Sequence, residues 1–127
     1  MKNVKLYEDF SDNEDEVYQT LQGYLECALW IEELEEYSIS DIDSLSTEQA
    51  RDDIDKFLDE LDENDLLDEL VSQMGYSSVG HDFWLTRNGH GTGFWDNSPL
   101  AGEEITKICE NFDHKDVFEE NGKIYIN

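Results

Sequence analysis

The stretch GHDFWLTRNGHGTGFWD, from Gly80 to Asp96, dominates the interpretation of this sequence. It places large aromatic residues on both sides of a glycine-rich centre. Aromatic side chains favour the pleated surface of a sheet, and an Asn-Gly pair such as Asn88-Gly89 is a strong hairpin signal. The block therefore predicts two short antiparallel strands, over Asp82 to Thr86 and Gly93 to Asp96, joined by a tight turn.

The sequence before this block predicts helices. One apolar stripe at helical spacing predicts a first helix from about Asn13 to Leu34, capped by Asp12 or Asn13; it consists of Val17, Leu21, Tyr24, Leu25 and Ala28. Gly23 inside that helix costs roughly 1 kcal/mol relative to alanine, which indicates close packing against a neighbour. Glu35 to Leu45 is expected to be a connection.

A second helix is expected to follow a capping box at Ser46 to Gln49. Its apolar face consists of Ala50, Ile54, Phe57, Leu58 and Leu61. The phase of the stripe slips near Asp62 to Asp65, and a new stripe continues to Met74. This slip predicts a kink or two consecutive helices, and Gly75 is expected to end the second one.

Beyond the block, Ala101 to Phe112 has a helical pattern. Asp116 to Phe118 and Lys123 to Ile126 then flank Asn121-Gly122, which predicts a second hairpin. The fold class is therefore expected to be α+β, with N-terminal helices packed on a small antiparallel sheet made of two hairpins with one intervening helix. A length of 127 residues suits one domain, with an acidic helical half over about 1–76 and a hairpin-helix-hairpin half over about 77–127.

The charge is unusual for so small a chain. Thirty-three acidic residues against eight basic ones give a net charge of -25, and no Lys or Arg lies between Lys5 and Arg51. Such a surface repels nucleic acid and anionic membranes and favours basic partners. We therefore expect no direct binding of DNA, RNA or membranes, since affinity for nucleic acid comes mainly from cations that face phosphates. A small core also makes a homodimer possible.

Three kinds of active site can be considered within the block. A metal site would use His81, His90 and an Asp, although the spacing is that of neither an HExxH helix nor a Cys/His finger. Acid/base catalysis by His81 and Asp82 is chemically possible, but neighbours on a strand point to opposite faces.

Phosphate binding is the third kind, because glycines beside Arg87 could cradle an anion, although the block lacks the Gly-Lys-Ser/Thr element of a Walker motif. A structural role explains the block better than any of the three, with glycines shaping the turn and aromatics filling the core. We therefore expect no catalytic residue, metal or cofactor. The residues given this structural role are His81, Asp82, Trp84, Arg87, Gly89, His90, Gly91, Gly93, Trp95 and Asp96.

The second helix carries a continuous acidic stripe at three- and four-residue steps. Its candidate partner-binding residues are Asp52, Asp55, Asp59, Asp62 and Glu63. The stripe is either a solvated face or a surface that recognises a basic protein. From Ser46 to Met74, 11 acids over 29 residues give roughly one charge per 4 Å of helix, against one per about 1.7 Å of duplex axis. One helix is thus too dilute to imitate DNA, but Asp12 to Glu36 beside it, or a dimer, could approach that density.

The two cysteines, Cys27 and Cys109, fall in helical patterns and form no CxxC pair. We expect two buried thiols in a reducing cytoplasm. The acids that follow Lys2 and Lys5 are not typical of a signal peptide, and the sequence holds no apolar run of membrane-spanning length.

The Gly80 to Asp96 block resembles a family of small phage proteins that also occur in prophages. The flanking segments YLECALW (Tyr24 to Trp30), YSISDI (Tyr37 to Ile42), GEEITKI (Gly102 to Ile108) and NGKIY (Asn121 to Tyr125) resemble the same family more weakly. The family includes a vibrio-phage inhibitor of the BREX defence system. The resemblance therefore implies a counter-defence protein in the host cytoplasm, with the BREX ATPase component as a candidate partner. An acidic DNA mimic and a small hydrolase that uses His81, His90 and Asp82 are the alternatives.

Overall fold

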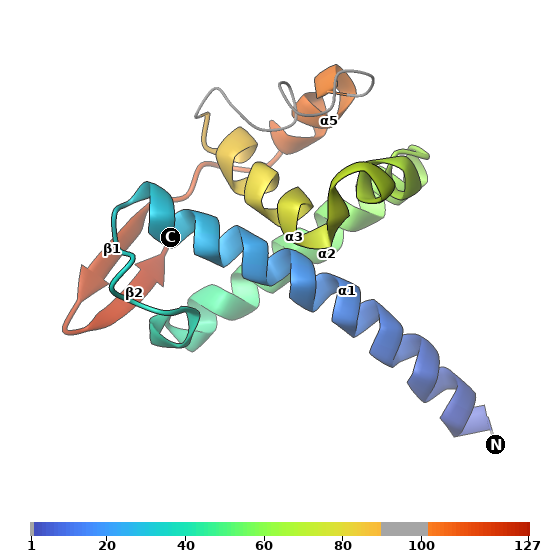
Figure 1. The fold of residues 1–127 in the computed structure, drawn as a ribbon, viewed down its shortest axis with the longest axis horizontal. Helices are drawn as coiled ribbons and strands as arrows, with labels where there is room; N and C mark the ends of the chain where they lie inside the picture. The colour runs from blue at the N-terminus through green and yellow to red at the C-terminus, as the bar shows by residue number, and fades with distance from the viewer. Residues whose placement is uncertain (1, 90–101) are drawn as a thin grey trace.

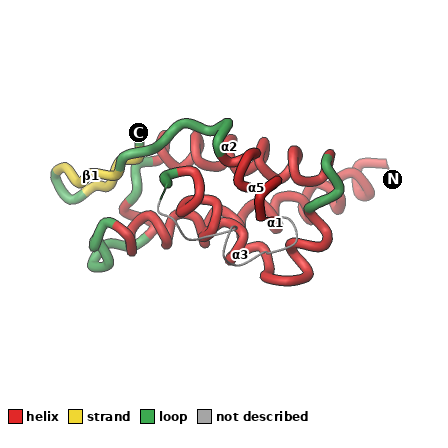
Figure 2. The backbone as a smooth tube through the Cα atoms, turned by 90° about the horizontal axis from the view of Figure 1, so that it is seen from above, coloured by secondary structure: helices red, strands yellow, loops and turns green. Residues whose placement is uncertain are grey.

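The computed structural model describes residues 2–89 and 102–127, with side chains from Asp15 onward in the first helix. The elements are α1 (Lys2–Ile31), a short 3-10 helix η1 (Ile39–Asp41), α2 (Ser44–Glu63), α3 (Leu67–Arg87), α5 (Gly102–Cys109), β1 (Val117–Glu120) and β2 (Lys123–Ile126). Helices predominate and the sheet is a small antiparallel pair, so the fold belongs to the α+β class. In Figures 1 and 2 the hairpin and the N-terminus lie at opposite ends of the molecule.

Helix α1 crosses the molecule and packs mainly on α3, with a smaller contact on α2 (Figure 1). All five residues of the predicted apolar face, namely Val17, Leu21, Tyr24, Leu25 and Ala28, are buried. The helix starts at Lys2 instead of Asn13, so the predicted cap at Asp12 or Asn13 is wrong. No glycine or proline lies between Met1 and Gln22, so no residue of this stretch breaks the helix before Asn13.

Two glycines let α1 and α3 approach closely. A Cβ atom on Gly23 would collide with the backbone carbonyl of Ser77, and one on Gly80 would collide with that of Thr20. The close packing predicted at Gly23 is therefore confirmed, and α3 supplies the matching glycine. Close approach of two backbones is the purpose for which glycine is retained inside helices despite its cost.

Helix α2 presents its predicted apolar face to the core. Ala50, Ile54, Phe57, Leu58 and Leu61 are all buried. The cap, however, is Asp43, whose carboxylate accepts a hydrogen bond from the Ser46 amide at 3.2 Å, so the predicted capping box at Ser46 is wrong. The Ser46 hydroxyl instead bonds to the backbone of Ile126, donating to its carbonyl at 3.3 Å and accepting from its amide at 3.1 Å. This pair of bonds ties β2 to the start of α2.

Helices α1 and α2 end in the same way. Leu34 donates its amide to the carbonyl of Leu29, and Leu66 donates to that of Leu61, each at 2.8 Å. The residues before them, Glu33 and Asp65, have φ of 57° and 58°. These are Schellman ends that use acidic residues where glycine is usual. The second one separates α2 from α3 where the apolar stripe slips in phase, which confirms two consecutive helices.

Helix α3 contains a break at Gly75, with φ of 81° and ψ of 159°, where the sequence predicts a helix end. Its second segment then runs through Asp82 to Thr86, so the predicted strand there is wrong. Helix α3 as a whole contacts α1, α2 and α5, and in this segment Asp82, Phe83, Trp84 and Leu85 are all buried. Burial on several faces outweighs the strand preference of the aromatic residues.

The Asn88-Gly89 pair ends α3 instead of turning a hairpin. Asn88 is the C-cap, and Gly89 follows with φ of 70° and donates its amide to the Thr86 carbonyl at 3.2 Å. Asn-Gly favours positive φ, and a helix end uses that property as well as a turn does. The other predicted strand, Gly93 to Asp96, lies outside the described residues. The predicted sheet of two hairpins is therefore wrong, since half of the first hairpin is helical.

The sheet that is present pairs Val117 with Ile126 and Glu120 with Lys123. Asn121 and Gly122, with φ of 55° and 82°, form its turn, where the sequence places the second hairpin. The Asp43 amide donates to the Ile124 carbonyl at 2.7 Å, and Ile42 forms a parallel bridge with Ile124. The hairpin is thus attached to the beginning of α2, and helices α1 and α3 pack chiefly on each other.

Candidate functional site

An acidic groove of about 420 Å³ lies where α1, α2 and α3 meet. Three apolar side chains, Val17, Leu58 and Leu67, line it together with acidic residues and a tyrosine. The acidic residues are Glu16 from α1, Asp55, Asp59 and Asp62 from α2, and Asp68 from α3; the tyrosine is Tyr76 from α3. We call this feature the acidic groove.

The amphipathic pattern of α2 places three of its carboxylates in the acidic groove. Leu58 is buried, whereas Asp55, Asp59 and Asp62 on the neighbouring side of the helix are exposed. Asp52 and Glu63, the other two predicted partner-binding residues, are also exposed but do not line the groove. Three of the five predicted residues therefore lie together in one concavity, and two lie on the surrounding surface.

Tyr76 joins two of the helices across the acidic groove. Its hydroxyl donates a hydrogen bond to the Glu16 carboxylate at 2.9 Å. Partial burial, and then the bond to Glu16, raise the pKa of Tyr76 to about 12. The phenol therefore stays protonated at neutral pH and keeps one carboxylate oriented while the others face solvent.

The sequence did not identify Glu16, Asp68 and Tyr76 as site residues. The only sequence feature that indicates Glu16 as a site residue is the acidity of Asp12 to Glu36. No local pattern indicates Tyr76. These residues come from α1 and α3 and meet the carboxylates of α2 only in the folded chain, so their place in the groove is a long-range consequence of the fold.

The electrostatics of the acidic groove are one-sided, because five of its lining residues are carboxylates and none of the described residues that line it is basic. Carboxylates around an apolar floor suit a lysine or arginine side chain, whose aliphatic stem packs on the floor while its charged end meets the acids. The groove is therefore suited to the recognition of a cationic group.

The described part of the Gly80 to Asp96 block has a different arrangement from the one expected. His81 and Asp82 lie on a helix instead of a strand, and His81 Nδ1 is 3.6 Å from Asp82 Oδ1, so the prediction that they point to opposite faces is wrong. The His81 ring also lies beside that of Trp30, with centroids 5.7 Å apart and the planes tilted by 34°. His90, Gly91, Gly93, Trp95 and Asp96 lie outside the described residues. Within residues 2–89 and 102–127, no group of three or more His, Cys, Asp or Glu side chains could hold a metal ion.

Arg87 is a buried centre of hydrogen bonds. Its Nη1 donates to Asp53 Oδ2 at 2.8 Å and to the Tyr24 hydroxyl at 2.9 Å, and its Nε donates to the Asp113 carbonyl at 2.9 Å. The guanidinium also lies over the rings of Phe83 and Phe112. Arg87 therefore cannot serve an anion in a glycine loop, and it links α1, α2 and α3 to the chain before β1. No local sequence pattern predicts its ion pair with Asp53.

The two cysteines are free and buried, as predicted. Burial, with Asp82 nearby, raises the pKa of the Cys27 thiol to about 12, and burial also raises the pKa of Cys109. A thiol is nucleophilic only as the thiolate, so both groups are unreactive near neutral pH.

Among the helices that the structure describes, none combines the length and the apolar character needed to cross a membrane. Comparisons with protein-family models, curated proteins and solved structures find no match to this chain.

Proposed function

We propose that this protein is a phage-encoded counter-defence protein that acts in the host cytoplasm by binding a basic surface of a host anti-phage complex. The observation that carries the proposal is the acidic groove, where carboxylates from three helices surround an apolar floor. Inhibition then results from stoichiometric occupation of the partner and needs no catalytic step. The resemblance of Gly80 to Asp96 to phage proteins supplies the specific candidate, the BREX ATPase component.

Charge supports this mechanism beyond the groove itself. A net charge of -25 attracts a basic partner over a distance and raises the rate of association, an effect that falls as salt increases. The carboxylates then determine which cationic side chains fit. Like charges so close together destabilise the isolated protein slightly, and a basic partner relieves that repulsion.

The test is a binding measurement between purified protein and purified BREX ATPase component. We expect saturable binding whose association rate falls with ionic strength. The variant Asp55→Lys/Asp59→Lys/Asp62→Lys should bind at least about tenfold more weakly, because three attractive contacts become repulsive. The matched control Glu48→Lys/Glu104→Lys/Glu110→Lys changes the same total charge at exposed positions outside the groove.

A deletion phage gives the biological readout. Its plaques should be fewer than those of the parent phage on a BREX host and equal on a host without BREX. Equal plating on both hosts, together with absence of binding, would exclude BREX as the target, and the same pair of assays can then be applied to other defence systems.

DNA mimicry is a second candidate, favoured by the carboxylates of Glu16 and Asp68. These residues add charge from α1 and α3 to the row on α2, which alone is too dilute to imitate a duplex. A DNA mimic competes with duplex DNA for one site on its partner. Binding that duplex DNA does not displace would favour recognition of a basic surface of another kind.

A further inference from the structure

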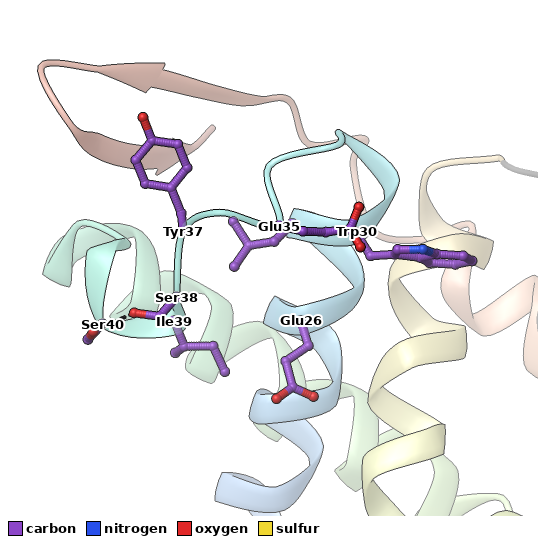
Figure 3. Close-up of a pocket in the computed structure, with 8 residues that line it drawn as sticks. Glu26, Trp30, Glu35, Tyr37, Ser38, Ile39 and Ser40 are labelled. Carbon is purple, nitrogen blue, oxygen red and sulfur yellow. Dashed lines mark hydrogen bonds between the residues drawn. The ribbon is translucent and has the colours of Figure 1, made fainter.

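A second groove, of about 440 Å³, lies between the C-terminal end of α1 and the turn that leads into η1 (Figure 3). We call it the Trp30 groove. Its lining includes Glu26, Leu29 and Trp30 from α1, Glu35 from the connection, and Ser38 and Ser40 beyond it. The two walls come from the segments Tyr24 to Trp30 and Tyr37 to Ile42. Neither segment contributes a lining residue to the acidic groove.

Trp30 is the most unusual residue of this surface, because 53% of it is exposed to solvent. In Figure 3 its indole extends from α1 over α3, on the side away from Ser38 and Ser40, and its ring lies beside that of His81, with centroids 5.7 Å apart. Tyr37 also lines the groove but its ring points toward the hairpin, so Trp30 is the aromatic residue at the α1 edge of the groove. An exposed tryptophan beside a concavity is typical of residues that contribute most to binding a partner.

The charges around Trp30 select the kind of partner group. Glu26 and Glu35 line the groove, and the Glu35 side chain extends toward Trp30 in Figure 3. Asp41 holds the opposite wall, accepting a hydrogen bond from the Ser38 amide at 2.9 Å. The C-terminal end of α1 adds the negative pole of its helix dipole. All of these features favour a cation beside the indole.

We propose that the Trp30 groove receives an arginine side chain of the protein partner. A guanidinium stacks flat on an indole and forms paired hydrogen bonds with carboxylates, so arginine uses both the ring and Glu26 or Glu35. The inference rests on the proposed function, because it supplies a second contact for the same basic partner. It differs from the acidic groove in chemistry, since an aromatic ring here takes part in recognition.

The experiment records the indole N–H resonance of Trp30 while a short peptide of alternating arginine and glycine is added. A peptide with citrulline in place of arginine has the same shape without the charge. The Trp30→Leu variant identifies the resonance and removes the ring. The matched control is Tyr18→Leu, because Tyr18 is 51% exposed on the same helix but does not line the groove.

We expect the arginine peptide to shift the Trp30 resonance and the citrulline peptide to leave it unchanged. Trp30→Leu and Glu35→Gln should each weaken peptide binding by about three- to fivefold, the size of one exposed cation–π contact or charged hydrogen bond. Tyr18→Leu should bind as the parent does. Equal shifts with both peptides, or parent-like binding by Trp30→Leu and Glu35→Gln, would overturn the inference.

The binding assay with the purified target separates this inference from the proposed function. Loss of target binding in the Asp55, Asp59 and Asp62 reversal, with parent-like binding by Trp30→Leu, would refute the Trp30 contact and leave the proposed function standing. Loss of target binding in Trp30→Leu, with parent-like binding by the Asp55, Asp59 and Asp62 charge reversal, would refute the role of the acidic groove and leave the Trp30 contact standing.

Discussion

Two regions built by the same three helices differ in what their residues do. At Gly80, α1 and α3 approach so closely that an added methyl group would collide with backbone. About two helical turns further along α3, Nε and Nη1 of Arg87 donate hydrogen bonds to partners inside the protein. In the acidic groove, Asp55, Asp59 and Asp62 of α2 face solvent, and no basic residue is found among the described side chains that line the groove. The difference separates a region whose polar groups are paired inside the protein from one whose charges face solvent.

The largest effect on stability is expected from Arg87→Met, in the first of these two regions. The substitution removes the hydrogen bonds to Asp53, Tyr24 and the Asp113 carbonyl while keeping an apolar side chain against Phe83 and Phe112. We expect the free energy of unfolding in urea to fall by about 3 kcal/mol, since one member of a largely buried pair is lost. A change below about 1 kcal/mol would contradict the central role given to Arg87.

A smaller but more diagnostic effect is expected from Gly80→Ala. Alanine normally stabilises a helix interior by about 1 kcal/mol relative to glycine. Here its methyl group collides with the Thr20 carbonyl, so the free energy of unfolding should fall by about 2 kcal/mol. Gly23→Ala should behave in the same way because of Ser77. A rise in stability in either variant would show that α1 and α3 can separate without cost.

Local sequence patterns predict part of this fold. The apolar stripes of α1 and α2, the break at Gly75 and the position of the C-terminal hairpin follow from local spacing and turn residues. Aromatic residues prefer sheets and therefore predict a strand over Asp82 to Thr86, whereas burial between elements of the folded chain makes this segment helical. That packing involves residues far apart in the chain.

The candidate site was predictable to a similar extent. Asp55, Asp59 and Asp62 could be named from their spacing, because one helix carries them all. Glu16, Asp68 and Tyr76 could not, because they reach the acidic groove only when α1 and α3 fold beside α2. The same applies to Asp53 as the partner of Arg87.

A third prediction concerns pH and the interior. Burial raises the pKa of Tyr24 to about 12 from 10.0, and burial raises the pKa of Cys27 to about 12 from 9.0. The unfolded chain therefore releases these protons first, so their stabilising contribution is complete below about pH 9 and is lost as pH rises toward 12. Urea unfolding should show stability falling across this range.

The control for the alkaline transition is Cys27→Ala, which should flatten the fall by up to one proton per molecule unfolded. Stability that stays constant up to about pH 12 would contradict the burial of both groups.

The smallest effect on folding is expected in the acidic groove, and it tests the central claim most directly. The measurement is the free energy of unfolding of Asp55→Lys/Asp59→Lys/Asp62→Lys, made beside its affinity for the purified target. We predict that stability is unchanged or rises by up to about 1 kcal/mol, because repulsion between neighbouring carboxylates is removed, while target binding is lost. A folded variant that binds the target as tightly as the parent would contradict the account.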